Sequence, residues 1–148
     1  MMIDEASDRP LDWLLNSLVE RVPQALNALL LSADGLATAS TRGLNQDDAD
    51  QLAAICAGLF SLAKGAGQKF ADSEEVRQVV VEIKGAMLFV AAAGFGTCIS
   101  VLTSGEADPG QIGYEMGKLV KSMRPHLETA PRVDRAAEAS GAWSRATS

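Results

Sequence analysis

The chain has 148 residues, 47% of them hydrophobic, which suits one packed core and is short for two domains. A net charge of −6 and a pI near 4.7 exclude the basic footprint of a nucleic-acid-binding protein. The chain contains no apolar run of about 18 residues, the length that crosses a membrane. Its acidic start, Met1 to Glu5, lacks the basic and apolar regions of a signal peptide, so we expect a soluble cytoplasmic protein.

The first predicted helix begins at Pro10 and ends before Pro23, whose ring cannot continue a helical hydrogen-bond ladder. Apolar residues recur in it at the spacing of one helical face: Leu11, Leu14, Leu15, Leu18, Val19 and Val22. Residues 1–10 are polar, and we expect them to form a flexible N-terminus.

A β-hairpin follows, with strands near 25–32 and 36–41. Asp34-Gly35 between them is the pair that favours a type I′ turn with positive φ at both corners. The first strand is largely apolar on both faces, which is typical of an inner strand in a sheet covered on both sides.

A long helix is predicted over about 46–69, with Asn45 as its N-cap. Small side chains form one strip along it: Ala54, Gly58, Ser61 and Gly65. Glycine inside a helix costs about 0.5–1 kcal/mol relative to alanine, so two glycines indicate the close approach of another backbone. Packing on the protein's own sheet and a helix–helix contact across a dimer both fit this strip.

Three further strands are expected at 76–84, 87–92 and 98–102, and a last helix begins at Asp108-Pro109. Pro125 ends or kinks that helix. Residues 129–148 have no apolar periodicity and are expected to form a disordered tail.

The chain offers no catalytic, cofactor-binding or metal-binding group of residues. The glycine-rich segment Lys64–Lys69 lacks the lysine and hydroxyl ending of a phosphate loop and lies at a helix end. His126 is the one histidine, too few for a metal site. Cys56 and Cys98 fall in apolar patterns, which favours free buried thiols over a disulfide. We therefore expect no enzyme activity.

Trp13 lies opposite the leucine stripe of the first helix. Two explanations fit equally: a contact with a partner, or a cover formed by the N-terminal residues.

The chain resembles the Roadblock (dynein light-chain) family, above all its actinobacterial branch, found beside a sensor-kinase-like protein and a Ras-like GTPase. Five stretches within residues 11–128 carry the resemblance, in the order 11–15, 31–36, 48–54 with Gly58-Leu59, 79–82 and 110–116. The resemblance implies an α/β domain over 11–128 with the order α-β-β-α-β-β-β-α. In it a five-stranded antiparallel sheet carries the middle helix on one face and the first and last helices on the other.

The resemblance also implies a homodimer, formed by paired third strands and packed middle helices. The expected interface consists of Ala54, Gly58, Ser61, Gly65, Val76, Gln78, Val80 and Glu82. Family members of this kind are non-enzymatic platforms for Ras-like GTPases, so a small GTPase is the implied partner and a sensor-kinase-like protein a further candidate.

Arg42 and Trp13 are the candidate partner contacts. Arg42 could act as an arginine finger or be an ordinary loop charge, and we favour the second because loop arginines are common. An alternative function is small-molecule sensing in a cavity under the helices, although the dense Leu, Val and Ala content of the strands argues against a cavity.

Overall fold

The computed structural model describes residues 10–128. Its elements in chain order are α2 (Pro10–Arg21), β1 (Ala25–Ser32), β2 (Ala37–Ser40), α3 (Gln46–Phe70), β3 (Gln78–Ile83), β4 (Ala86–Gly94), β5 (Thr97–Ser104) and α4 (Pro109–Glu128). This confirms the predicted order, with element ends shifted by a few residues. The expected flexible N-terminus and disordered tail lie outside the described residues, apart from Pro10, which begins α2.

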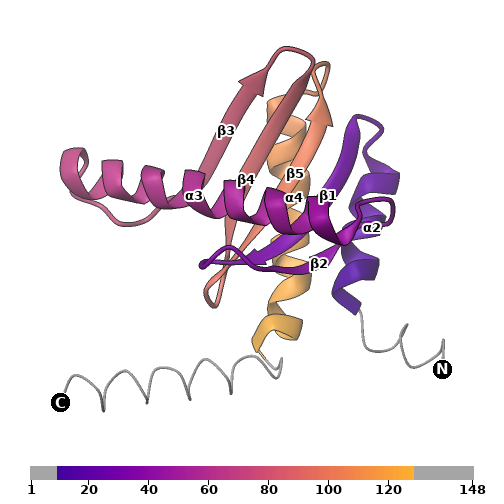
Figure 1. The fold of residues 1–148 in the computed structure, drawn as a ribbon, viewed down its shortest axis with the longest axis horizontal. Coiled ribbons are helices and arrows are strands. Elements are labelled where there is room, and N and C mark those ends of the chain that lie inside the picture. Colours follow the sequence, from indigo (N-terminus) through magenta and orange to yellow (C-terminus); the bar gives the residue numbers. More distant parts are fainter. Residues whose placement is uncertain (1–9, 129–148) are drawn as a thin grey trace.

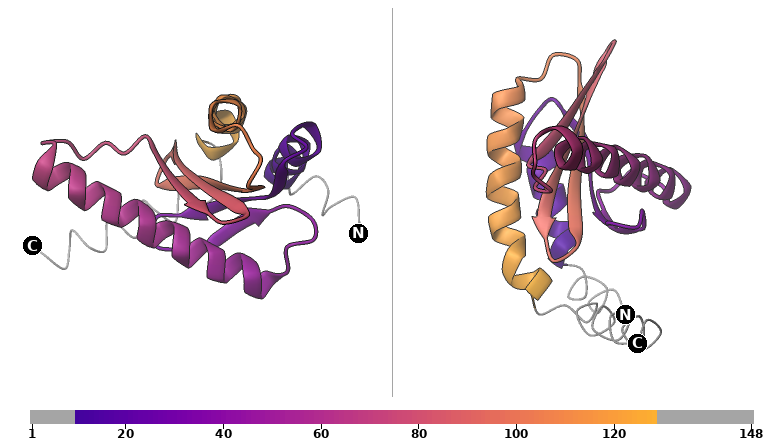
Figure 2. Two further views of the ribbon diagram at one scale, coloured as in Figure 1. Left: turned by 90° about the horizontal axis from the view of Figure 1, so that it is seen from above. Right: turned by 90° about the vertical axis from the view of Figure 1, so that its left-hand side faces the viewer.

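The five strands form one antiparallel sheet in the order β2-β1-β5-β4-β3 (Figure 1). Helices α2 and α4 lie on one face, and α3 crosses the other (Figure 2). Strands β2 and β3 are the two edges, so each has one side without a strand neighbour in the described part of the chain.

Each face of the sheet has its own apolar core. The core beneath α2 and α4 is the larger one, built around Leu15, Leu18, Leu30, Phe89, Ile99, Met116 and Met123. The core beneath α3 is smaller and is built around Leu29, Leu31, Ala53, Cys56, Leu88, Val90 and Cys98. Strand β1 contributes to both cores, which confirms the prediction of an inner strand covered on both sides.

The β1–β2 turn is not the predicted type I′ turn. Gly35 has a φ of +90°, but Asp34 does not have a positive φ. The Gly35 amide donates to the Ser32 carbonyl at 3.0 Å, and Ser32 and Leu36 pair across the turn. The loop is therefore longer than the two-residue loop of a type I′ hairpin, and Gly35 is its single residue with a left-handed conformation. A Cβ on Gly35 would lie 3.6 Å from the Cα of Ala54, an ordinary contact, so the positive φ is what favours glycine here.

Helix α3 begins as predicted, because the Asn45 side chain accepts a hydrogen bond from the Asp48 amide at 2.8 Å. At its other end the amides of Ala71 and Ser73 both donate to the Gly67 carbonyl, at 3.0 and 3.1 Å. These bonds satisfy a carbonyl that the helix end leaves open and fold the chain back toward β3. Pro125 does not end α4, which continues to Glu128.

Gly67 has to be glycine for this return of the chain. A Cβ at Gly67 would lie 2.6 Å from the Ser73 carbonyl oxygen. We expect Gly67→Ala to destabilise the fold by about 1–3 kcal/mol and to lower the melting temperature by several degrees. Calorimetry of the purified protein measures this.

Gly117→Ala is the matched control, because a Cβ at this α4 position meets open space. The control should keep or raise stability, by up to about 1 kcal/mol. Equal melting temperatures for the two variants would contradict the close approach at Gly67.

Candidate functional site

The exposed side of α3 is the first candidate interaction surface. The last buried residue of α3 is Cys56, and the 14 residues from Ala57 to Phe70 contain none. The start of this half still packs on the core through the partly buried Ala57, Leu59 and Phe60. The helix then extends past the β3 edge of the sheet (Figures 1 and 2). At 1.5 Å per residue this overhang, residues 61–70, is about 15 Å long.

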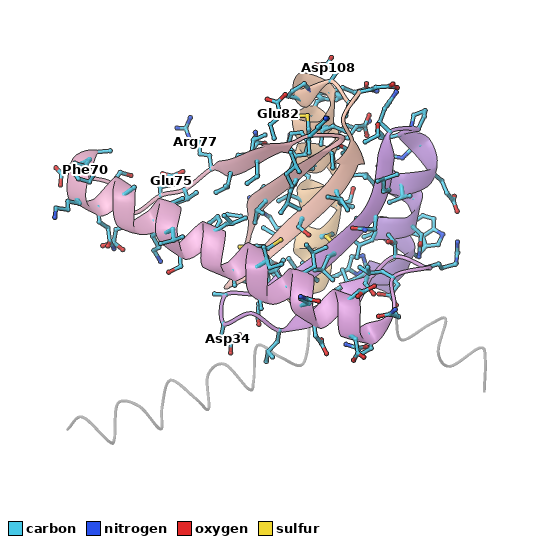
Figure 3. The ribbon with its side chains drawn as sticks, turned by 45° about the horizontal axis from the view of Figure 1, so that its top comes forward. Asp34, Phe70, Glu75, Arg77, Glu82 and Asp108 are labelled. Carbon is cyan, nitrogen blue, oxygen red and sulfur yellow. The ribbon has the colours of Figure 1, made fainter. Side chains whose placement is uncertain are left out.

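Large apolar side chains are exposed along this helix. Leu62 is 74% exposed and Phe70, at the far end of the overhang, is 82% exposed (Figure 3). Ile55 is half exposed on the same outward side as Leu62, two helical turns earlier. Ile55 and Leu62, with Phe70 at the far end of the helix, form an apolar strip. An exposed apolar strip is typical of a surface that contacts another protein.

The small residues predicted for the dimer interface lie on this outward side. Ala54, Gly58, Ser61 and Gly65 are all exposed. A Cβ on Gly58 or Gly65 would have no atom within 4 Å in the described part of the protein. The first explanation for the strip, packing on the protein's own sheet, is therefore wrong for these two glycines.

The edge strand β3 carries the other half of the predicted interface. Val79 and Val81 pack into the core beneath α3. Gln78, Val80 and Glu82 alternate with them, so they point to the α4 side of the sheet and are exposed. The predicted interface residues of β3 and α3 therefore lie on opposite faces of the sheet, and only the open backbone edge of β3 adjoins the overhang. Val76, the last member of the predicted set, precedes β3 and is half-buried.

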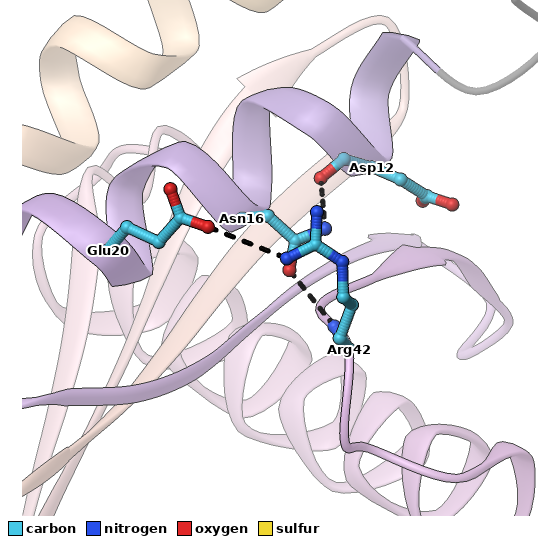
Figure 4. A network of polar contacts seen from close by, with 4 residues as sticks. All are labelled: Asp12, Asn16, Glu20 and Arg42. Carbon is cyan, nitrogen blue, oxygen red and sulfur yellow. Dashed lines mark hydrogen bonds and ion pairs between the residues drawn. The ribbon is translucent and has the colours of Figure 1, made fainter. Parts of the chain in front are cut away.

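Arg42 lies at the opposite end of α3 from the overhang, in the loop that leaves the β2 edge. Its backbone amide donates to the Asn16 side chain at 3.0 Å, and its guanidinium is 3.5 Å from the Glu20 carboxylate (Figure 4). Both side chains of the Arg42–Glu20 pair are exposed, so the pair holds the guanidinium weakly. The fold thus anchors the loop backbone to α2 while the charged group stays accessible.

Trp13 is 66% exposed on α2, one helical turn before Asn16. The structure therefore brings the two candidate partner contacts to neighbouring positions, since Arg42 is bonded to Asn16. The alternative, a cover over Trp13 formed by the N-terminal residues, lies outside the described residues. Sequence reasoning placed Trp13 correctly, but it did not link Trp13 to Arg42, because a loop 29 residues away has no helical register with α2.

The two cysteines are buried free thiols, as predicted. Burial raises the pKa of the Cys98 thiol to about 11, and neighbouring Cys56 adds to the rise. Burial also raises the pKa of Cys56, and the Ser100 hydroxyl offsets part of this shift. Within residues 10–128 there is no cluster of three or more metal-binding side chains, and no helix is long and apolar enough to span a membrane.

The family model of the Roadblock/LC7 domain matches residues 11–103, and the chain belongs to this family. A Roadblock/LC7 domain from Streptomyces avermitilis is 52% identical, with a TM-score of 0.77, over 80% of this chain and 98% of the other. MglB from Myxococcus xanthus has a TM-score of 0.72 at 16% identity over 80% of this chain and 95% of its own. A Schizosaccharomyces pombe profilin, at 14% identity over 78% of this chain and 97% of its own, has a TM-score of 0.56. The last two show the fold alone. No curated protein sequence matches the chain.

Both thiols should resist modification in the native protein. Because the reactive form is the thiolate, and burial holds both pKa values above the usual 9.0, we expect almost no reaction with Ellman's reagent in mildly alkaline buffer. Both thiols should react at once after unfolding in guanidinium chloride. Fast native labelling of either thiol would show that α3 opens away from the sheet; labelling of Cys56→Ser and Cys98→Ser proteins identifies which one.

Proposed function

We propose that this protein is a homodimeric, non-enzymatic adaptor that binds a Ras-like small GTPase in the cytoplasm and modulates its nucleotide state or its location. Membership of the Roadblock/LC7 family supports this function. The observation that carries it is the α3 overhang, the end of a long helix that extends past the sheet and has no buried residue (Figure 1). A sensor-kinase-like protein of the same signalling system is proposed as a further partner, on the family resemblance alone.

The overhang favours a second copy because it is a poor helix by itself. Isolated helices shorter than about 12–15 residues are marginal in water, and their stability in proteins comes from packing an apolar face. The 14 residues after Cys56 include Gly58, Gly65 and Gly67, each of which weakens a helix. The α3 helix of a second copy, packed along the outward side of α3, would bury Leu62. It would also explain why Gly58 and Gly65 have open space around them.

The open edge of β3 supports the same arrangement. A free edge strand presents unpaired backbone groups and is a hazard for aggregation unless it is covered. A twofold axis beside β3 would pair it with its copy and would place both overhangs on the same side of the extended sheet. One symmetry operation would then cover the strand edge and the apolar strip together.

The partner GTPase is proposed to bind the dimer surface around the α3 helices, with Arg42 at or near its rim. The protein itself should bind no nucleotide, since the segment Lys64–Lys69 is part of helix α3 and carries no phosphate loop. The small-molecule alternative is not proposed, because both faces of the sheet carry cores of closely packed apolar side chains.

The dimer makes a first prediction. The unmodified protein should scatter light with twice the mass of the 15.5 kDa chain at micromolar concentration. Gly58→Leu together with Gly65→Leu should shift it to a monomer, because bulky side chains where two helices meet cost roughly 1–3 kcal/mol each.

Gly117→Leu is the control, since it places the same side chain on an exposed glycine of α4. This variant should remain a dimer. A monomeric unmodified protein would exclude the dimeric platform.

A second prediction concerns Arg42. It is tested with a small GTPase that is loaded with GDP or GTP and is found to bind the protein in a pull-down. If Arg42 is a charge at the rim, Arg42→Ala should weaken GTPase binding by about 1 kcal/mol or less. GTP turnover should then change only with the fraction of GTPase bound. As an arginine finger, its loss should lower turnover by about 10³-fold or more while binding persists. We expect the first result.

Lys84→Ala is the control, because Lys84 is an exposed cation in the β3–β4 turn, away from α2. Should no small GTPase bind in either nucleotide state, the proposed function fails while the fold and family stand.

A further inference from the structure

The outer surface of α4 is a second, chemically different surface. Five residues of this helix face the core: Ile112, Met116, Leu119, Met123 and Leu127. With 3.6 residues per turn, Tyr114, Lys118 and Lys121 lie directly opposite that stripe, and Arg124 lies on its flank. All four are exposed, and no aliphatic side chain separates them along the outward side.

This surface is basic on an acidic protein. Three of the nine lysines and arginines in residues 10–128 are Lys118, Lys121 and Arg124, whereas Asp and Glu outnumber Lys and Arg in the rest of that part. In the described structure none of these three cations has a carboxylate within ion-pair distance. Of the two α4 glutamates, Glu115 pairs with α2 and Glu128 ends the helix.

Tyr114 adds an aromatic ring to the cations. It is 66% exposed, and the Lys118 ammonium nitrogen is 5.3 Å from its ring centroid. A cation over the ring holds both groups in a fixed relation at the surface. Tyrosine is also among the residues that dominate binding energy where proteins meet.

We propose that the α4 outer face, formed by Tyr114, Lys118, Lys121 and Arg124, binds an acidic segment of a partner protein. From Tyr114 to Arg124 the face is about 15 Å long at 1.5 Å per residue. It fits a helix of about three turns with carboxylates every three or four residues, whose spacing matches that of the cations. Ammonium and guanidinium groups without an internal partner form charge-assisted hydrogen bonds with such carboxylates.

Other polyanions fit this face less well. Helices that bind a bilayer surface insert an apolar face, but the apolar face of α4 is buried in the core. Nucleic acids bind through many phosphate contacts, and a net charge of −6 opposes them beyond the reach of three cations.

The α4 face and α3 lie on opposite sides of the sheet (Figure 2). An acidic segment on α4 would therefore leave the α3 surface free. This proposal does not depend on the GTPase assignment, and the two can fail separately.

Fluorescence anisotropy with a labelled three-turn helical peptide, carrying glutamate at every third or fourth position, tests the proposal on the full chain. We expect binding at low salt that Lys118→Glu with Lys121→Glu weakens by about tenfold or more. Tyr114→Ala should weaken binding as well, and the peptide with glutamine in place of glutamate should not bind. Circular dichroism checks that each variant keeps its fold.

Lys64→Glu with Lys69→Glu is the matched control, because it makes the same change in net charge on exposed residues of α3, on the opposite side of the sheet from α4 (Figure 2). It should leave peptide affinity within about twofold, because the cations that face the peptide are unchanged. Equal weakening by the two double variants would overturn the proposal, since the peptide would then sense only net charge.

Three further results would overturn it. One is no binding of the glutamate peptide at low salt. Another is that the protein binds phosphatidylglycerol vesicles but not the peptide, and that Lys118→Glu with Lys121→Glu abolishes vesicle binding. The α4 face would then be a membrane-binding surface. The last is self-association: without peptide, light scattering would show a larger mass at low salt than at high salt. If the same double variant removes this increase, the acidic segment is on a second copy of this chain.

Discussion

The constraint on which this structure depends is a sheet with apolar side chains on both faces. Leu29 and Leu31 of β1 point to one side while Ala28 and Leu30 point to the other, and β4 and β5 alternate in the same way. Such a sheet is stable only when both faces are kept from water. Residues 10–128 form three helices, and two of them, α2 and α4, cover one face.

Among the described residues the other face has α3 alone, and α3 covers only part of it (Figure 2). The first half of the helix packs through Ala49, Ala53 and Cys56, whose small side chains bring it close to the strands. The second half first packs on the core through Leu59 and Phe60 and then continues past the edge of the sheet, where Leu62 and Phe70 are exposed. Within residues 10–128 the apolar strip of α3 therefore lies beside the unpaired edge of β3. A second protein surface could cover both.

The two faces of the protein have opposite character as a result. The α3 side offers an apolar strip interrupted by glycines, which favours close packing of another helix. The α4 side has its apolar residues turned inward and presents lysines, an arginine and a tyrosine. A domain can connect two partners when its two faces select for different chemistry. Arg42, in the loop before α3, and Trp13, on α2, lie at the opposite end of α3 from the overhang.

The sequence by itself determined the elements, their order and most of the core. Leucine spacing before Pro23, the Asn45 cap and the alternation of Val79 and Val81 are local signals, because side-chain periodicity and capping act within a few residues. The same signals placed Trp13 outside the core and both cysteines inside it. The overall sheet and helix layers came from the family resemblance, which five stretches in the right order made specific.

Only the tertiary structure decided features that join distant parts of the chain. The pairing of β1 with β5 joins residues some 70 positions apart, and no local pattern encodes that choice. The turn at Gly35 differs from its prediction, and its loop is also held from outside the hairpin, since the Ala33 amide donates to the Gly96 carbonyl at 3.1 Å. Gly58, Gly65 and Gly67 look alike in the sequence, yet only Gly67 has a backbone against it, since only there does the chain fold back. The basic face of α4 was readable as the complement of its core stripe, but the absence of ion pairs to its three cations within residues 10–128 depends on which elements pack beside α4.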